Sequence, residues 1–197
     1  MESISPAVAT LTSAVLVGFG SHFMVEDYRR FRDSKTIAAG LAGELESITL
    51  SLPKLLPGLY MMKTMLDDQE KISLPEMPHQ SSPIFEANTE KVGLLGTKLV
   101  GEVAFIYDQI RAFRTAYQLL SKHHTTMDAP WSSLLVGSCI ELIETNKSRA
   151  EILIEHLKRH SDACYGSSRW LGMAILSGLT AVCLAMLFGA VFCARPT

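Results

Sequence analysis

This sequence of 197 residues has little charge, and what it has is nearly balanced. Only 19% of the residues are charged, and 18 Lys+Arg against 20 Asp+Glu give a formal net charge of −2. Soluble domains average about 25% charged residues, so some part of this chain must be depleted of charge. The near balance argues against a nucleic-acid binder, which needs a basic face, and it excludes an acidic disordered tail.

The sequence also lacks the motifs of common catalytic and nucleotide-binding sites. GxxxxGK, GxGxxG and GxSxG are all absent. The four cysteines have no CxxC spacing, and we interpret them as small apolar residues in a reducing compartment. Carboxylates two positions apart, such as Glu44 and Glu46, lie on different faces of a helix. We therefore expect no enzymatic activity and no cofactor.

Two stretches, residues 6–25 and 170–194, contain no Asp, Glu, Lys or Arg. About 20 apolar residues at 1.5 Å each span the roughly 30 Å hydrocarbon layer, so both are predicted to be transmembrane helices. A buried amphipathic helix is the alternative for the first, whose Thr and Ser residues dilute its apolar content. Lys and Arg gather on the central sides of both stretches. The positive-inside rule therefore predicts that residues 26–168 are cytoplasmic and that both termini lie outside.

Small residues recur every four positions along both predicted transmembrane helices. Such a stripe allows another helix to approach closely. We therefore expect these helices to pack against each other or against copies of the protein. The positions are Ala14 and Gly18 in the first and Ser177, Ala181, Ala185 and Gly189 in the second.

Between these stretches, apolar residues recur with alternating steps of three and four, the pattern of helices packed at a shallow angle. No segment alternates with a period of two over the length of a strand, so the predicted fold is all-α. It consists of two transmembrane helices flanking a cytoplasmic antiparallel bundle of long, coiled-coil-like helices. The predicted bundle helices cover residues of about 34–66, 97–121 and 131–163, with a return strap at 67–96.

Pro53 and Pro57 interrupt the hydrogen bonding of the first bundle helix. Because the apolar pattern continues across them, we expect a kink at residues 51–58, with a complete break as the alternative. Asn146 occupies an otherwise apolar face of the third helix. A buried Asn there fixes register or oligomeric state, whereas an exposed one has no such role.

The strap contains the sequence FEANTEKVGLL at residues 85–95. Asn88 can cap a short helical turn, and Gly93 can end it in the left-handed conformation. The apolar members of the motif would then face the bundle. These are Phe85, Val92, Leu94 and Leu95. We interpret the motif as a docking device rather than as a functional site.

This motif resembles one shared by an uncharacterised family of bacterial membrane-anchored helical proteins. The shared pattern, of the type FEANxxKxGLL, is matched by Phe85, Glu86, Ala87, Asn88, Lys91, Gly93, Leu94 and Leu95. A helix with an aromatic cluster follows it, matched by Phe105–Tyr107. The resemblance covers residues 83–115 and implies a bacterial inner-membrane setting. The family has no established activity or catalytic residues.

The best candidates for metal ligands are His156, His160 and Cys164, which are spaced by four and share one face of the third helix. Zinc accepts this ligand set but needs a fourth ligand from elsewhere. Beside Lys158 and Arg159, two histidines at helical spacing are more typical of a solvated or interfacial face. We therefore predict no metal site.

These features favour a non-enzymatic inner-membrane protein that acts as an accessory, assembly or scaffolding subunit through helix–helix contacts. Its expected partners are the lipid bilayer and other membrane proteins or further copies of the chain, with no nucleic acid. Two alternatives stay open: a membrane-anchored signalling or regulatory helical module, and a bundle that binds a lipid or small molecule. The last requires a cavity near the kink at Pro53 and Pro57.

Overall fold

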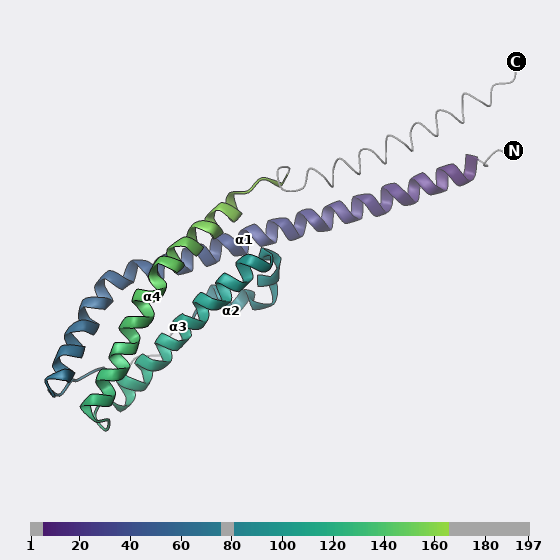
Figure 1. The fold of residues 1–197 in the computed structure, drawn as a ribbon. Coiled ribbons are helices and arrows are strands. Elements are labelled where there is room, and N and C mark those ends of the chain that lie inside the picture. Colours follow the sequence, from purple (N-terminus) through teal and green to yellow (C-terminus); the bar gives the residue numbers. More distant parts are fainter. Residues whose placement is uncertain (1–5, 76–80, 166–197) are drawn as a thin grey trace, which may run out of the picture. The chain divides into compact units, whose positions relative to one another are not determined.

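The computed structural model describes residues 6–75 and 81–165. These two ranges hold four α-helices and one 3-10 helix, with no strand, so the all-α prediction is confirmed for them. In chain order the elements are α1 (Pro6–Asp67), α2 (Pro83–Asn88), the 3-10 helix η1 (Thr89–Leu95), α3 (Thr97–His123) and α4 (Ala129–Asp162) (Figure 1). The chain divides into two units, of which one comprises residues 34–162 and the other holds the described segments 6–33 and 163–165.

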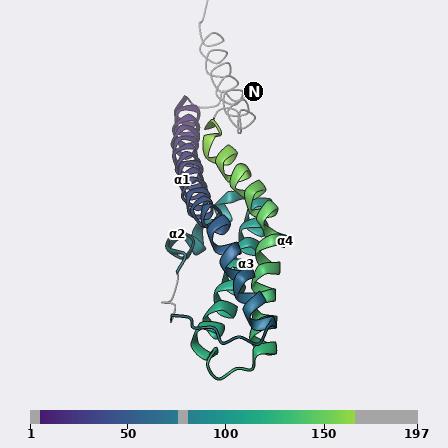
Figure 2. The same ribbon diagram turned by 90° about the vertical axis from the view of Figure 1, so that its left-hand side faces the viewer.

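The larger unit is a bundle of three long helical segments. α3 and α4 form an antiparallel hairpin, and the part of α1 from Ser34 onward packs beside them (Figure 2). α1 also runs antiparallel to α4, because Lys158 reaches Glu46 at 2.8 Å near one end and Ser133 accepts from Lys63 at 3.0 Å near the other. Between these two contacts, the Tyr60 hydroxyl donates to the Glu144 carboxylate.

A side-chain cap and a glycine with positive φ mark the starts of two helices of the bundle, α4 and α3. The Asp128 carboxylate accepts a hydrogen bond from the Trp131 N–H at 3.2 Å, which satisfies an orphan donor at the start of α4. Gly96, with a φ of +84°, joins η1 to α3 in a conformation that favours glycine. The sequence analysis assigned this left-handed role to Gly93, and that assignment was wrong, because Gly93 continues the 3-10 helix.

Pro53 and Pro57 lie inside α1, which continues through them as one helix. Each proline removes an intrahelical hydrogen bond and pushes on the carbonyl of the residue four positions earlier. The bundle segment of α1 accordingly bends rather than breaks, as the blue part of the ribbon shows (Figure 1).

The core of the bundle consists of two separate clusters of buried side chains. The first joins α1, η1, α3 and α4 around Leu41, Leu45, Val103, Leu153 and Leu157. The second joins α1, α3 and α4 around Leu59, Leu120, Val136 and Cys139. Ile72 and Leu74, at the start of the strap, pack against the second cluster.

The smaller unit is held by aromatic contacts within its described residues. The Tyr165 ring lies edge-on to Tyr28 and Phe31, with ring centroids 5.3 and 5.2 Å apart. Its hydroxyl donates to the Asp27 carboxylate at 2.9 Å. The Tyr165 side chain thus makes three contacts with the α1 segment of the same unit.

Within the described ranges, no helix combines the length and the hydropathy that a membrane crossing requires. This finding contradicts the predicted multi-pass membrane localisation with a cytoplasmic centre and both termini outside. The first predicted transmembrane segment, residues 6–25, is the start of α1, which continues without interruption into a charged segment. Thr, Ser and His residues lower the hydropathy of this segment. The second predicted segment, residues 170–194, lies outside the described residues.

Candidate ligand cavity

A cavity of about 480 Å³ lies between α1, α3 and α4. It coincides with a gap in the core, because each helix has a stretch there without any buried residue. These stretches are residues 46–58 of α1, 108–119 of α3 and 144–152 of α4. The two core clusters close the bundle on either side of the gap. Cavities of about 300–1,000 Å³ are the size of small-molecule sites in proteins.

Two features of the sequence account for the gap. The two prolines lie in α1 at this level, and each removes an intrahelical hydrogen bond, which favours a bend there. On α4, the positions that face the gap carry Asn146 and Ala150, which are smaller or more polar than the leucines on either side. Protein interiors are packed as densely as organic crystals, so a cavity of this size, which is partly open to solvent, is a local exception.

The walls of the cavity are mainly aliphatic. They include Ile48, Leu52 and Leu55 of α1, Ile110 and Phe113 of α3, and Leu142 of α4. Neutral polar residues from all three helices interrupt these walls. They are Thr49, Ser51, Gln109 and Asn146. The three charged residues of the lining, Lys54, Arg114 and Lys147, are all cationic.

The polar side chains of the lining are partly engaged by the helices themselves. The Asn146 amide donates to the Leu142 carbonyl at 2.9 Å, which leaves its own oxygen as an acceptor. The Thr49 hydroxyl donates to the Leu45 carbonyl at 2.8 Å. Asn146 therefore lies in a cavity wall, half-buried, rather than in the tight helix–helix contact that fixes register.

Arg114 is held in place from outside the cavity. Its guanidinium donates to the hydroxyl of Ser82 at 2.8 Å, and Ser82 is buried. The Ser82 N–H in turn donates to Glu86 at 3.0 Å at the start of α2. Lys54 and Lys147 are exposed and form no ion pair within the described residues. Sequence analysis missed these lining residues, and its only signals were the proline pair and Asn146.

The FEANTEKVGLL motif docks on the bundle through a partly buried polar contact. The Glu44 carboxylate accepts hydrogen bonds from the N–H groups of Ile84 and Phe85, both at 3.2 Å, and from the Tyr107 hydroxyl at 2.6 Å. The Phe85 and Tyr107 rings stack with centroids 4.0 Å apart. Burial, followed by the bond to Glu44, raises the pKa of Tyr107, so this hydroxyl stays protonated. A Cβ atom at Gly40 would lie only 3.0 Å from Ile84 Cγ2.

The remaining residues of the motif are structural. Leu95 is buried in the first core cluster, and Leu94 packs against it. The Asn88 amide donates back to the Ile84 carbonyl at 2.8 Å and makes no side-chain cap to η1, so the predicted capping role was wrong.

The three predicted metal-ligand candidates do not form a metal site. No group of three possible ligands comes together anywhere in the described part of the chain. His156 Nδ1 lies 3.1 Å from a Glu102 oxygen, and His160 Nε2 lies 2.7 Å from the Ser34 hydroxyl. Cys164 is exposed and belongs to the other unit.

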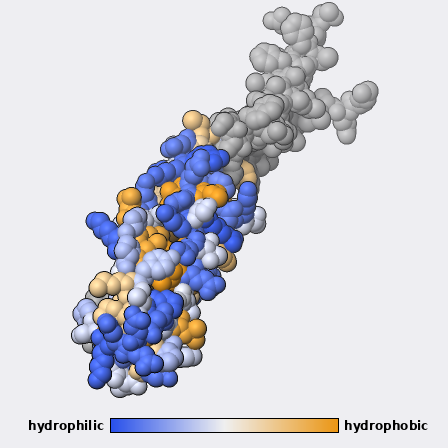
Figure 3. Space-filling view, turned by 60° about the vertical axis from the view of Figure 1, so that its left-hand side comes forward, coloured by the Kyte–Doolittle hydropathy of each residue, from blue (hydrophilic) through white to orange (hydrophobic). Residues whose placement is uncertain are grey.

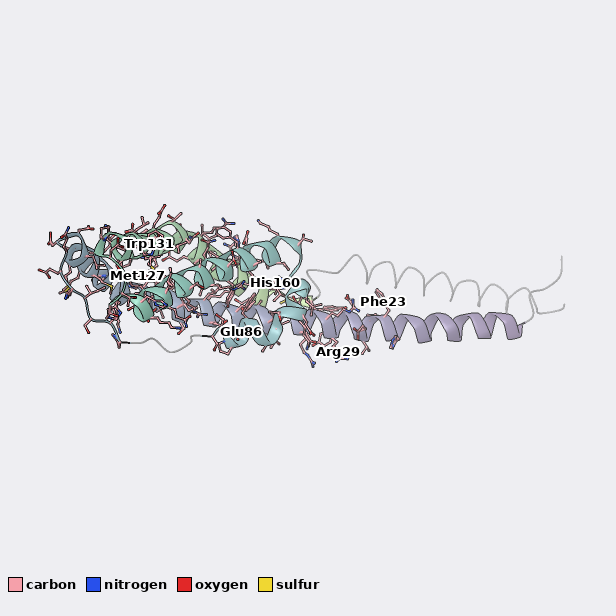
Figure 4. The ribbon with its side chains drawn as sticks, turned by 90° about the horizontal axis from the view of Figure 1, so that it is seen from below. Phe23, Arg29, Glu86, Met127, Trp131 and His160 are labelled. Carbon is pink, nitrogen blue, oxygen red and sulfur yellow. The ribbon has the colours of Figure 1, made fainter. Side chains whose placement is uncertain are left out.

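His160 instead connects three elements of the bundle. The Ser34 hydroxyl donates its single proton to the Leu94 carbonyl at 2.9 Å, so His160 Nε2–H must donate to Ser34. Burial, followed by the charge of Lys35, lowers the pKa of His160. This histidine lies at the end of the bundle opposite Trp131 (Figure 4).

Ala14 and Gly18 lie in the first part of α1, and Ser177, Ala181, Ala185 and Gly189 lie outside the described residues. Cys139 belongs to the second core cluster, where burial raises the pKa of its thiol to about 11. It is therefore an uncharged core residue at neutral pH.

No family model, curated protein or solved structure matches this chain. The resemblance of residues 83–115 to bacterial helical proteins thus stays a prediction.

Proposed function

We propose that the bundle is a non-enzymatic binding module that takes an apolar or amphiphilic small molecule between α1, α3 and α4. The observation that supports the proposal is the cavity at the proline kink, where none of the three helices has a fully buried residue. A bundle that binds a lipid or small molecule requires such a cavity near the kink at Pro53 and Pro57.

The chemistry of the lining supports the same proposal. Apolar walls from three helices provide a surface that gains free energy when a ligand removes it from water. A few polar groups among them provide orientation, which is the usual composition of a small-molecule site. Because the cavity separates two intact core clusters, a ligand can enter it without unfolding either cluster.

The test is direct titration of the full chain with decanol, a neutral alkyl probe, followed by calorimetry. We expect saturable binding at one site and an increase in thermal stability with decanol concentration. Ala150→Leu, which adds carbon atoms to the cavity wall, should weaken binding at least tenfold, or about 1.4 kcal/mol. Ala104→Leu makes the same change on an exposed face of α3 and should leave it unchanged. Equal binding to both variants would refute the proposal.

A second candidate function is protein binding as an accessory or scaffolding subunit. Trp131 and Leu134 lie three residues apart on the first turns of α4, and they are 50% and 58% exposed. Residues at this spacing share a helix face. Figure 3 shows further apolar side chains among polar ones on one face of the bundle.

Native mass measurement of the purified full chain tests this second function. If Trp131 and Leu134 form a contact with a second copy of the chain, the wild type should be oligomeric and the variant Trp131→Ser/Leu134→Ser monomeric. A strictly monomeric wild type without a stoichiometric companion would refute it.

A further inference from the structure

We propose that the ligand of the cavity is a single-chain amphiphile with an anionic head group. This inference rests on the proposed function and adds the chemical class of the ligand. It is carried by the charges of the lining, which are three cations from three different helices, with no carboxylate among the lining residues.

This charge distribution departs from that of the rest of the chain. The sequence has more acidic than basic residues, and several cations elsewhere in the bundle lie beside carboxylates, as in the Lys63–Asp67 and Lys158–Glu46 pairs. Lys54 and Lys147 have no such pair among the described residues, although both line the cavity. Their ammonium groups are therefore available to an anion that enters it.

Arg114 adds a positioned donor to these two lysines. Its hydrogen bond to the buried Ser82 fixes one side of the guanidinium and restricts the side chain, while further N–H groups stay available. A planar guanidinium pairs with carboxylate and phosphate groups in two-point geometry. Both head groups therefore fit the same chemistry.

The apolar part of the lining favours an alkyl chain over an aromatic ring system. Phe113 is the single aromatic residue among the residues that line the cavity, and the other apolar residues are aliphatic. The aliphatic walls extend along the helices from Leu45, in one core cluster, to Ile143, in the other. A flexible chain can follow such a surface and leave its head group beside the lysines.

The experiment compares four probes with the same ten-carbon chain on the full-length protein, at concentrations where they are monomeric. The probes are decanoate, decyl phosphate, decanol and decyltrimethylammonium, and calorimetry gives their dissociation constants. We expect at least one anionic probe to bind at least tenfold more tightly than decanol and the cationic probe. This preference should decline at high ionic strength, because the lysines are exposed. Comparison of the two anionic probes identifies the preferred head group.

Matched lysine variants test the assignment to the cavity. Lys54→Gln/Lys147→Gln should lower the preference for the anionic probe over decanol below tenfold, and Arg114 accounts for the preference that remains. Lys91→Gln/Lys98→Gln removes two exposed lysines outside the lining and should keep the preference. Equal binding of all four probes, or an anion preference that Lys54→Gln/Lys147→Gln leaves unchanged, would overturn this inference while the proposed function stands. Absence of binding by every probe would overturn both.

Discussion

The substitution Ala150→Leu tests whether the gap between the two core clusters is a real cavity. Ala150 is half-buried and lines the cavity from α4. In a helix–helix contact packed to normal density, a larger side chain at this position forces strain that costs about 1–3 kcal/mol. In a cavity, the same side chain finds room and buries new apolar surface. The two arrangements therefore predict opposite signs for the change in the free energy of unfolding.

The expected magnitude follows from the atoms added. Leucine has three more carbon atoms than alanine, and each buried CH₂ group contributes about 0.8 kcal/mol, which gives an upper bound of about 2.4 kcal/mol. Ordering the longer side chain costs about 0.5–1 kcal/mol. The wall position is only half-buried, so part of the new surface stays in water. We therefore expect the free energy of unfolding of Ala150→Leu to increase by about 1 kcal/mol.

Urea denaturation of the full chain measures this change. Ala104→Leu on the exposed face of α3 is the matched control, because it carries the same difference in helix propensity without a cavity. Its free energy of unfolding should stay within about 0.5 kcal/mol of the wild type. If Ala150→Leu is less stable than Ala104→Leu by 1 kcal/mol or more, the region is already packed and the cavity reasoning is refuted.

Three further predictions concern the contacts around the bundle. Gly43→Ala should increase the free energy of unfolding by about 1 kcal/mol, because alanine has the higher helix propensity. Gly40→Ala should increase it less, because the added Cβ would lie against Ile84 of α2. Equal increases for the two variants in urea denaturation would contradict this close approach of α2 to Gly40. Glu44→Ala should lower the free energy of unfolding, measured by urea denaturation, by about 2 kcal/mol, because it leaves three hydrogen-bond donors without their acceptor. Glu46→Ala removes only an exposed ion pair and should lower it by less than about 1 kcal/mol. Similar losses for the two variants would contradict the docking role of Glu44. The pKa of His160 is lowered in the folded state, so the unfolded chain binds a proton at this histidine more readily than the folded chain does. The stability that the neutral His160 contributes is therefore lost as the pH falls below its ordinary pKa of about 6.5. His160→Gln should flatten the decline in the free energy of unfolding between pH 8 and pH 5, and an unchanged pH profile would count against this assignment.

Local sequence signals were sufficient for the helices of the bundle. The steps of three and four between apolar residues depend only on the helical repeat, and in the structure α3 and α4 begin and end within a few residues of the segments inferred from them. Pro53 and Pro57 also act locally, and the continuous apolar pattern across them correctly indicated a bend without a break. By contrast, sequence alone did not assign the positive φ to Gly96 rather than to Gly93, because each glycine directly follows an apolar residue, Leu95 and Val92 respectively.

Residues whose roles depend on distant partners were less predictable. His156 and His160 share a helix face, as their spacing requires, yet they contact different residues. His156 contacts Glu102 on α3, and His160 contacts Ser34 on α1. Spacing along one helix cannot reveal these partners, because it carries no information on what the facing helix presents. The same holds for Glu44, whose spacing from Glu46 indicated only that the two lie on different helix faces and whose carboxylate is the acceptor that docks α2.

The low content of charged residues says less about the fold of this protein than the periodicity of its apolar residues does. That periodicity alone specifies an all-α chain, since the helical repeat is a property of each segment by itself. Only the tertiary structure decided which apolar positions touch. Ile48, Leu52, Ile110 and Phe113 continue the pattern of the core, yet they line a cavity. Whether such residues pack closely depends on the distance between the helix axes, to which the bend of α1 contributes. It also depends on the size of the α4 side chains that line the cavity, Asn146 and Ala150.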